Sequence, residues 1–405
     1  MPQQSAESLK TGRVSGARKR AIREAFIGYL FITPATVLLT VFGLFPLLYA
    51  VYISLHRWRI KKGPFLGLKN YTKALGDPKD ILWFAIGVAL LIGSWYLWKS
   101  MTRERRTWAM VVKFLAVIVF IAGAWGMFTG LGKMIESGDQ TMYEAFVVTV
   151  FYAVGIVPMQ LGLALLLAVM LYQKIKGKDM YRMIYFMPYV TITVASAGVF
   201  RAIFSRRPES IANQLAGFLG IEPQKWLQEP HGIWELVFGH FGVNLQEVFK
   251  TMGVDSFLAF ILAGPSLALL SIMLYNLWVF VGYNSVIFLA GLGAIPSDLY
   301  EAAEIDGANR WHIFRHVTLP LLSPTIYFLT IITVMGVFKA INHVLVMREP
   351  AAQGTVDTAS LYIFDQFYLS TRFGYASAIA MVLFLVILTL TFVQNRIAQR
   401  RVFYG

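Results

Sequence analysis

The chain has 405 residues, of which 57% are hydrophobic and 14% are charged, and its mean hydropathy of +0.60 lies outside the range of soluble globular domains. The net charge of +14 does not indicate nucleic acid, because Lys and Arg cluster in short segments beside apolar runs, as they do in membrane proteins with several spans. The chain contains no cysteine, which excludes disulfide bonds and thiolate metal sites.

Eight apolar runs are long enough to cross about 30 Å of hydrocarbon as helices. Together they predict an all-α, polytopic membrane helical bundle with about eight transmembrane helices. The runs are Phe26–Ser54, Ile81–Trp98, Met110–Leu131, Tyr143–Tyr172, Ile184–Phe204, Gly264–Leu292, Leu321–Ile341 and Tyr375–Val393.

The first run follows a basic tail, residues 1–25, which predicts a cytoplasmic N-terminus. Residues 26–54 lack the short apolar region and cleavage site of a signal peptide, so they are predicted to be an uncleaved span. Counting crossings from there puts the basic connections after the second and fourth spans, and the tail 396–405, in the cytoplasm as well. The same count puts residues 56–80 outside although they carry seven basic and two acidic residues, so charge alone leaves the side of this segment open.

Residues 205–258 form the longest segment that is predicted to lie outside. The segment mixes charges of both signs, and residues 232–252 keep apolar residues at helical spacing. This pattern predicts a small, ordered periplasmic cap.

A polar stretch, residues 296–320, separates the sixth and seventh spans. Pro296 ends the preceding span, Ser297 can cap a new helix, and Gly307 can provide a sharp turn into a second helix. The first of these helices carries small alanines beside the carboxylate of Glu301, which suits close docking by another protein. The alternative is an amphipathic helix on the membrane surface, but such helices are usually basic, and an acidic start is unfavourable beside an anionic leaflet.

Polar and aromatic residues within the spans mark a candidate substrate path, because unpaired polar groups in hydrocarbon are costly and usually face a cavity or another helix. They are Gln160, Tyr275, Asn276, Tyr283 and Asn284. Asn276 and Tyr283 are seven residues apart, so they share one helix face and suit hydrogen bonding and ring stacking against a sugar. Bridging between helices is the alternative role for these side chains.

Motifs predict neither a catalytic site nor a metal or cofactor site. The nearest approach to a phosphate loop, residues 126–134, has the wrong glycine spacing and has Met134 where Ser or Thr must reach magnesium. His312 and His316 are four residues apart, but the general-base Glu of a zinc protease is absent between them. A secondary transporter of a small polar solute is the alternative function, although the carboxylates here lie in loops or at span ends and not inside spans, where ion coupling needs them.

The stretch from Glu301 to Pro320 resembles the EAA loop of binding-protein-dependent ABC importer permeases. The shared pattern is Glu301-Ala302-Ala303, three residues, Gly307, nine residues, Val317, one residue and Leu319-Pro320, with Val where Ile is usual. The segments FLAGLGAIPSDLYEAAEIDGA and FRHVTLPLLSPT resemble the sugar-uptake permeases of the maltose and glycerol-phosphate type, as do GLKNY, YRMIYFMPYV, IANQLAGFLGI and FGYASAIAMVLF. The resemblance covers the first span and almost everything from about Tyr143 onward.

This resemblance implies a six-helix importer core with an inserted transmembrane hairpin at residues 78–141. Residues 143–395 hold most of the permease core, including the periplasmic segment 205–258 and a cytoplasmic coupling loop at 296–320. Residues 231–256 are also extra relative to the family. The usual Gly-Gly-Pro of the last external loop is replaced by REPAAQGT.

The resemblance also implies a function, namely the permease subunit of an ATP-driven ABC importer for a sugar, oligosaccharide or related polyol in a bacterial inner membrane. The expected partners are a second permease subunit, two cytoplasmic ABC ATPase subunits that hydrolyse the ATP, a periplasmic or lipid-anchored solute-binding protein, and membrane lipid. The residues expected to dock an ATPase are Glu301, Ala302, Ala303, Asp306 and Gly307. Asp306 and Arg310, at i and i+4, are expected to form a supporting ion pair.

Overall fold

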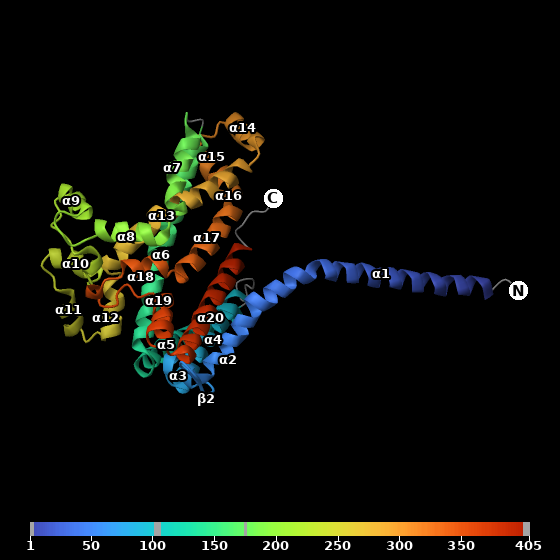
Figure 1. Ribbon diagram of the computed structural model, residues 1–405, viewed down its shortest axis with the longest axis horizontal. Coiled ribbons are helices and arrows are strands. Elements are labelled where there is room, and N and C mark those ends of the chain that lie inside the picture. The colour runs from blue at the N-terminus through green and yellow to red at the C-terminus, as the bar shows by residue number, and fades with distance from the viewer. Residues whose placement is uncertain (1–3, 101–106, 174–175, 400–405) are drawn as a thin grey trace.

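The apolar runs form helices in a computed structural model that describes residues 4–100, 107–173 and 176–399 (Figure 1). Within these residues, six helices are long and apolar enough to cross a membrane, and two bent pairs of helices pass the same test as pairs. The predicted bundle of about eight spans is therefore confirmed, with two of the spans broken. The six helices are Arg20–Ser54, Pro78–Lys99, Val111–Ser137, Gln140–Tyr172, Leu267–Gly293 and Phe373–Ala398.

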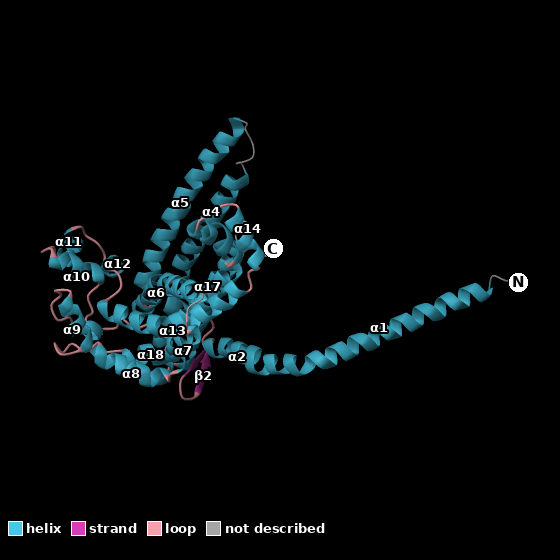
Figure 2. Ribbon diagram, turned by 90° about the horizontal axis from the view of Figure 1, so that it is seen from above, coloured by secondary structure: helices cyan, strands magenta, loops and turns pink. Residues whose placement is uncertain are grey.

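The first span is a long helix that leaves the body of the protein. The helix begins before the span and consists of α1 (Gln4–Leu39), a π-helical turn η1 (Thr40–Leu44) and α2 (Phe45–Ser54), of which Arg20–Ser54 is the span. α1 projects to one side in two perpendicular views (Figures 1 and 2), and residues 20–46 are all exposed. The apolar side chains exposed along residues 20–46 need lipid or another apolar protein surface around them.

A short β-hairpin and a helix follow the first span. The strands β1 (His56–Trp58) and β2 (Lys62–Phe65) pair antiparallel, and α3 (Lys69–Leu75) comes next. The all-α prediction did not include this hairpin, because strands of three and four residues leave too little alternation to detect.

The helices α4 (Pro78–Ser100) and α5 (Thr107–Ser137) pack against each other along their length. Gly87 of α4 faces the backbone of Met127, and Gly130 of α5 faces the backbone of Phe84, so a side chain at either glycine would overlap the other helix. Small residues at a helix interface allow such close packing inside a membrane. This pair occupies the segment 78–141, for which a hairpin was expected.

Two long helices, α6 (Gln140–Tyr172) and α13 (Leu267–Gly293), form the centre of the bundle and carry much of its buried core. The remaining core helices around them are α17 (Ser323–Phe338), α18 (Asn342–Met347), α19 (Ala359–Phe364) and α20 (Phe373–Ala398). A π-helical turn η6 (Asp365–Leu369) follows α19, and a 3-10 turn η5 (Pro350–Ala352) precedes it.

The fifth predicted span, residues 184–204, is present but is not one continuous helix. The chain forms α7 (Lys178–Val190) and α8 (Thr193–Ile203), which meet at 93°. Pro188 removes a backbone donor near the end of α7, and Thr191 is extended, so the helix cannot continue. α7 packs so closely on α13 that a side chain at Gly282 would overlap the carbonyl of Tyr185.

The seventh predicted span, residues 321–341, is also broken. The path from α15 to α16 meets α17 at 63°, with the break at Leu322, and α17 ends at Phe338. The elements of this path are α15 (Arg310–Ile313), the π-helical turn η4 (Phe314–Thr318) and α16 (Leu319–Leu321).

Between α8 and α13 the chain forms a group of short helices at the left of Figure 1. They are α9 (Ile211–Phe218), the 3-10 turn η3 (Trp226–Gln228), α10 (Ile233–His240), α11 (Leu245–Thr251) and α12 (Ser256–Ala263). Side chains of Ser210, Asn244 and Asp255 accept hydrogen bonds from the first free backbone N–H groups of α9, α11 and α12.

The bundle has two distinct ends. The helix α14 (Ser297–Ile305) lies at one end together with the start of α7 and the end of α20, while α3 and the β-hairpin lie at the other end (Figure 1). The basic segment 56–80 is therefore at the end of the bundle opposite α14.

Candidate functional site

A cavity of about 300 Å³ lies at the centre of the bundle, between α6, α7, α8, α13, α17 and α18. Four of the five residues predicted for a substrate path line it, namely Gln160, Tyr275, Asn276 and Tyr283. Asn284 is buried on α13 but does not line the cavity. The structure thus brings together residues from two helices that are more than 100 positions apart in the sequence.

Aromatic rings form one wall of the cavity. The rings of Tyr189 and Tyr283 are stacked, with centroids 4.2 Å apart and planes inclined by 19°. Tyr189 belongs to the last turn of α7, so the bend between α7 and α8 helps to set its position. Stacked rings provide a flat apolar surface beside the cavity.

Hydrogen bonds fix Tyr275 and His343, two other residues that line the cavity. The Tyr275 hydroxyl donates to the carbonyl oxygen of Thr193 at 3.2 Å and lies 2.8 Å from the hydroxyl of Ser196. The Tyr152 hydroxyl pairs with Nε2 of the buried His343 at 2.6 Å. These groups are already satisfied, so they fix the shape of the cavity here.

Gln160 differs from these groups because its side-chain carbonyl lacks a partner. The side chain is 2% exposed, and within the described residues Oε1 accepts no hydrogen bond. A buried acceptor without a donor is costly and usually marks a place where water or a ligand binds. Asn284 is equally buried and its Nδ2 also lacks a partner, but it lies away from the cavity.

Sequence reasoning missed several residues of this site. Lys339, Asn342 and His343 line the cavity from the end of α17 and the start of α18, and Tyr189 and Thr193 line it from the two sides of the α7–α8 bend. The signal available in the sequence was their position at the ends of apolar runs, which is common to many polar residues. Lys339 is the one charged side chain among the described residues that line the cavity, so the site favours neutral, hydrogen-bonding ligands or weakly anionic ones.

The second candidate site is the surface loop from α14 to α15. Glu301, Ala302, Asp306 and Gly307 are exposed, and Ala303 is partly buried. Gly307 has φ of +78°, the left-handed conformation that ends α14 sharply. The predicted helix, glycine turn and helix are therefore present, at the end of the bundle marked by α14 in Figure 1.

Two details of this loop differ from expectation. Ser297 does not cap α14 but is its first residue, after Pro296, and the side chain of Asn309 caps α15 by accepting from the His312 N–H at 2.9 Å. In the described part of the chain no ion pair joins Asp306 to Arg310, because the turn at Gly307 separates them and removes the i, i+4 geometry of a continuous helix.

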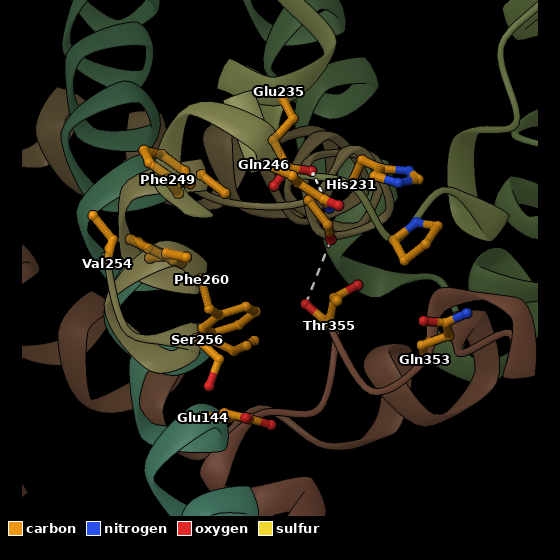
Figure 3. A pocket seen from close by; sticks show the side chains of 18 of the residues that line it. Glu144, His231, Glu235, Gln246, Phe249, Val254, Ser256, Phe260, Gln353 and Thr355 are labelled. Atoms are coloured by element: carbon orange, nitrogen blue, oxygen red, sulfur yellow. Dashed lines mark hydrogen bonds between the residues drawn. The ribbon is translucent and has the colours of Figure 1, made fainter. Parts of the chain in front are cut away.

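A third concave region lies beside the short helices at the left of Figure 1. This pocket of about 500 Å³ is bounded by α6, by α10 to α12 and by the segment before α19 (Figure 3). Figure 3 shows Glu235 and Gln246 on one side, joined by a hydrogen bond of 3.5 Å, and Glu144 on the other. The rings of Phe249 and Phe260 lie between them, so the pocket mixes acidic and apolar surface.

A charge cluster holds the segment between α18 and α19. Arg348 donates to Asp357 at 2.5 Å and to Asp365 at 2.7 Å, and one guanidinium cannot neutralise two carboxylates. Burial, together with the charge of Asp365, outweighs the attraction of Arg348 and raises the pKa of Asp357 to about 6.

This raised pKa predicts that the stability of the protein falls as pH rises from about 4 to about 6. In that window the folded state retains a proton on Asp357 that the unfolded state releases, so raising the pH favours unfolding by about 2–3 kcal/mol in total. Asp357→Asn should remove this dependence, while the exposed control Asp298→Asn should keep it. Unfolding in detergent between pH 4 and pH 7 measures the effect, and an unchanged slope in Asp357→Asn would contradict it.

Comparisons with known proteins place the chain among transport proteins. Residues 160–404 match the family model described as the inner membrane component of binding-protein-dependent transport systems. The chain is 30% identical over 274 residues to the arabinooligosaccharides transport system permease protein AraP of Bacillus subtilis, which covers 67% of this chain and 76% of that protein. It is 25% identical to the trehalose/maltose transport system permease protein MalF of Thermococcus litoralis, covering 95% of this chain and 97% of that protein.

Solved structures share the fold. A bacterial ABC transporter involved in the import of the acidic polysaccharide alginate contains a chain with a TM-score of 0.51 and 20% identity, covering 75% of this chain and 99% of that one. The bacterial alginate transporter in complex with a periplasmic protein bound to alginate pentasaccharide gives a TM-score of 0.52 and 21% identity, covering 75% and 97%.

Proposed function

Because the chain belongs to the family of inner membrane components of binding-protein-dependent transport systems, we propose that it is the permease subunit of an ABC importer for a sugar or oligosaccharide. Members of this family are transport permeases and not catalytic enzymes. Membership also decides against the alternative of a secondary transporter. The solutes in the names of its relatives, arabino-oligosaccharides and trehalose or maltose, point to the same class of solute.

The observation that supports a carbohydrate most directly is the lining of the central cavity. Neutral amides of Gln160 and Asn276 can bond to hydroxyl groups, and the stacked rings of Tyr189 and Tyr283 can pack against the apolar face of a sugar ring. The volume of about 300 Å³ is at the small end of ligand pockets, which suits one or two sugar units in this conformation.

A coupling role for the loop from α14 to α15 follows from its connection to the cavity. The loop continues through η4 and α16 into α17, and α17 carries Thr333 and Gly336 to the cavity wall. A force applied to Glu301, Ala302, Ala303, Asp306 or Gly307 by a docked ATPase would therefore reach the substrate path through one helix. Movement of α17 relative to α13 would open the cavity to one side or the other.

This role sets the orientation and the partners. The loop and both termini face the cytoplasm, where two ABC ATPase subunits bind. The short helices α9 to α12 and the pocket of Figure 3 lie on the outside, where a periplasmic or lipid-anchored solute-binding protein delivers the sugar. A second permease subunit completes the pore, and the exposed first span is available to contact that subunit or lipid.

Co-purification tests the proposal. The tagged full-length protein, extracted from native membranes in mild detergent, should bring down an ABC ATPase and a second permease. With Glu301→Lys, the amount of ATPase recovered should fall at least about tenfold, because a reversed charge at a docking surface costs several kcal/mol. Glu209→Lys, an exposed charge reversal far from the loop, is the matched control and should retain the partners.

Two outcomes would contradict the proposal. Recovery of the wild-type protein alone would remove the importer assignment. Equal recovery of the ATPase with wild type and Glu301→Lys would keep an importer but remove the docking role of this loop.

A further inference from the structure

A small basic pocket lies at the end of the bundle opposite α14. Its volume is about 230 Å³, and it is formed by β1, α3 and the residues that begin α20. Four cationic side chains line it, namely Arg57, Arg59, Lys73 and Arg372. These cations come from three separate parts of the chain, so the fold brings them together.

The charges of this pocket are not neutralised within the described residues, where none of the four cations forms an ion pair. Lys73 lies over the ring of Tyr375 at 4.5 Å. The carboxylate behind that ring, Asp139, already accepts hydrogen bonds from the hydroxyls of Tyr362 and Tyr375 and from the N–H of Met142. The four cations carry more positive charge than the single carboxylate of Asp139 can offset, so an external anion would stabilise the site.

The floor of the pocket is rigid. The buried Asn70 donates from Nδ2 to the carbonyl oxygens of Ser54 at 2.7 Å and His56 at 3.1 Å. His56 in turn donates from Nδ1 to the carbonyl oxygen of Tyr52 at 2.8 Å. A side chain at Gly374 would overlap the carbonyl of His56, so α20 packs directly on the strand. A pocket held in this way needs little reorganisation to bind a ligand.

The surroundings of the pocket indicate the kind of anion. Ile60, Phe65 and Leu68 are 80%, 67% and 66% exposed, and they lie between the basic residues of the same segment. The rings of Tyr52 and Trp58 are 6.2 Å apart at the point where the first span ends. Exposed apolar side chains, interfacial aromatic rings and cations together are typical of the headgroup level of a membrane.

We propose that Arg57, Arg59, Lys73 and Arg372 bind the phosphate group of an anionic phospholipid at this face of the membrane. Arginine binds phosphate oxygens in a bidentate manner, and the neighbouring exposed apolar side chains contact the acyl chains. With the orientation proposed above, the site also accounts for a basic segment on the outer side of the membrane. It does not depend on which solute the protein transports.

Titration of the delipidated full-length protein with short-chain lipids tests this site, because a ligand that binds the folded state raises the unfolding temperature. Dioctanoyl phosphatidylglycerol should raise the unfolding temperature by several degrees, and dioctanoyl phosphatidylcholine should not. The triple variant Arg57→Ala, Lys73→Ala, Arg372→Ala should weaken phosphatidylglycerol binding about tenfold or more. The triple variant Lys61→Ala, Lys69→Ala, Lys79→Ala also removes three positive charges, all of them from residues 56–80 and outside the pocket. It should bind phosphatidylglycerol as the wild type does.

Several outcomes would overturn the proposal. Equal weakening by the two triple variants would show diffuse charge and no pocket. Both lipids contain a phosphate, so an equal response to the two would show that the net negative charge of phosphatidylglycerol is not recognised. Stabilisation by inorganic phosphate without stabilisation by phosphatidylglycerol would identify a soluble anion as the ligand. Loss of solute-binding-protein docking in the pocket variant, with lipid binding intact, would identify a protein surface. The lipid comparison on the wild type decides the matter even when a variant does not fold.

Discussion

Gly307→Pro is expected to abolish uptake while the protein still reaches the membrane in normal amount. Gly307 has φ of +78°, and proline requires φ near −65°, so the turn between α14 and α15 cannot form with proline. Apart from its two chain neighbours, no atom of the described residues lies within 4 Å of the position that a Cβ would occupy at Gly307, so the effect arises from the backbone and not from a clash. The loss of uptake in Gly307→Pro is measured with labelled sugar in cells and normalised to the amount of protein in the membrane.

A graded series at Gly307 separates the turn from a general loss of folding. Asparagine tolerates the left-handed conformation and should keep most of the uptake, alanine costs about 1–2 kcal/mol in that conformation, and the β-branched valine costs more. Uptake is therefore expected to fall in the order glycine, asparagine, alanine, valine and proline at position 307. The same order should hold for recovery of the ATPase with the tagged protein. An equal rate of sugar uptake by the wild type and all four variants would show that the shape of this turn does not matter for coupling.

The helical bundle could be predicted from the sequence because a continuous apolar run of about 20 residues is rare outside a membrane span. The bends could not be predicted, since hydropathy reports burial and not direction. At residues 184–204 one apolar run forms two helices at 93°, and Pro188 was the one visible warning. The β-hairpin at 56–65 was not predicted because its strands have only three and four residues, several of them polar, and so show no alternating pattern.

The residues of the candidate site also divide into those that the sequence could predict and those that it could not. Gln160, Tyr275, Asn276 and Tyr283 were selected because polar groups in spans need partners, and the structure brings them to one cavity. Asn284 was selected by the same rule and lies elsewhere, because the residue after Tyr283 on a helix points in a different direction. The expected ion pair between Asp306 and Arg310 failed because sequence spacing implies contact only within one continuous helix.

The two buried amides on α6 and α13 provide the sharpest test of the cavity. Gln160→Leu should raise the sugar concentration needed for half-maximal uptake about tenfold, since a hydrogen bond to a neutral group in a dry site contributes roughly 1–1.5 kcal/mol. The same change should not lower the unfolding temperature, because leucine has a similar volume and removes a buried acceptor that has no partner in the described residues. Uptake kinetics and thermal unfolding of the purified protein give the two readouts.

Asn284→Leu is the matched control for this prediction. Asn284 is as buried as Gln160 and also has an unpartnered polar atom, but it does not line the cavity. The unfolding temperature should respond to the two substitutions in the same direction, while the concentration for half-maximal uptake should change for Gln160→Leu alone. An equal change in uptake for both variants would mean that buried amides act on transport through packing. An unchanged value for Gln160→Leu would move the substrate path away from this cavity, because a sugar that passes Gln160 cannot leave its carbonyl oxygen without a donor.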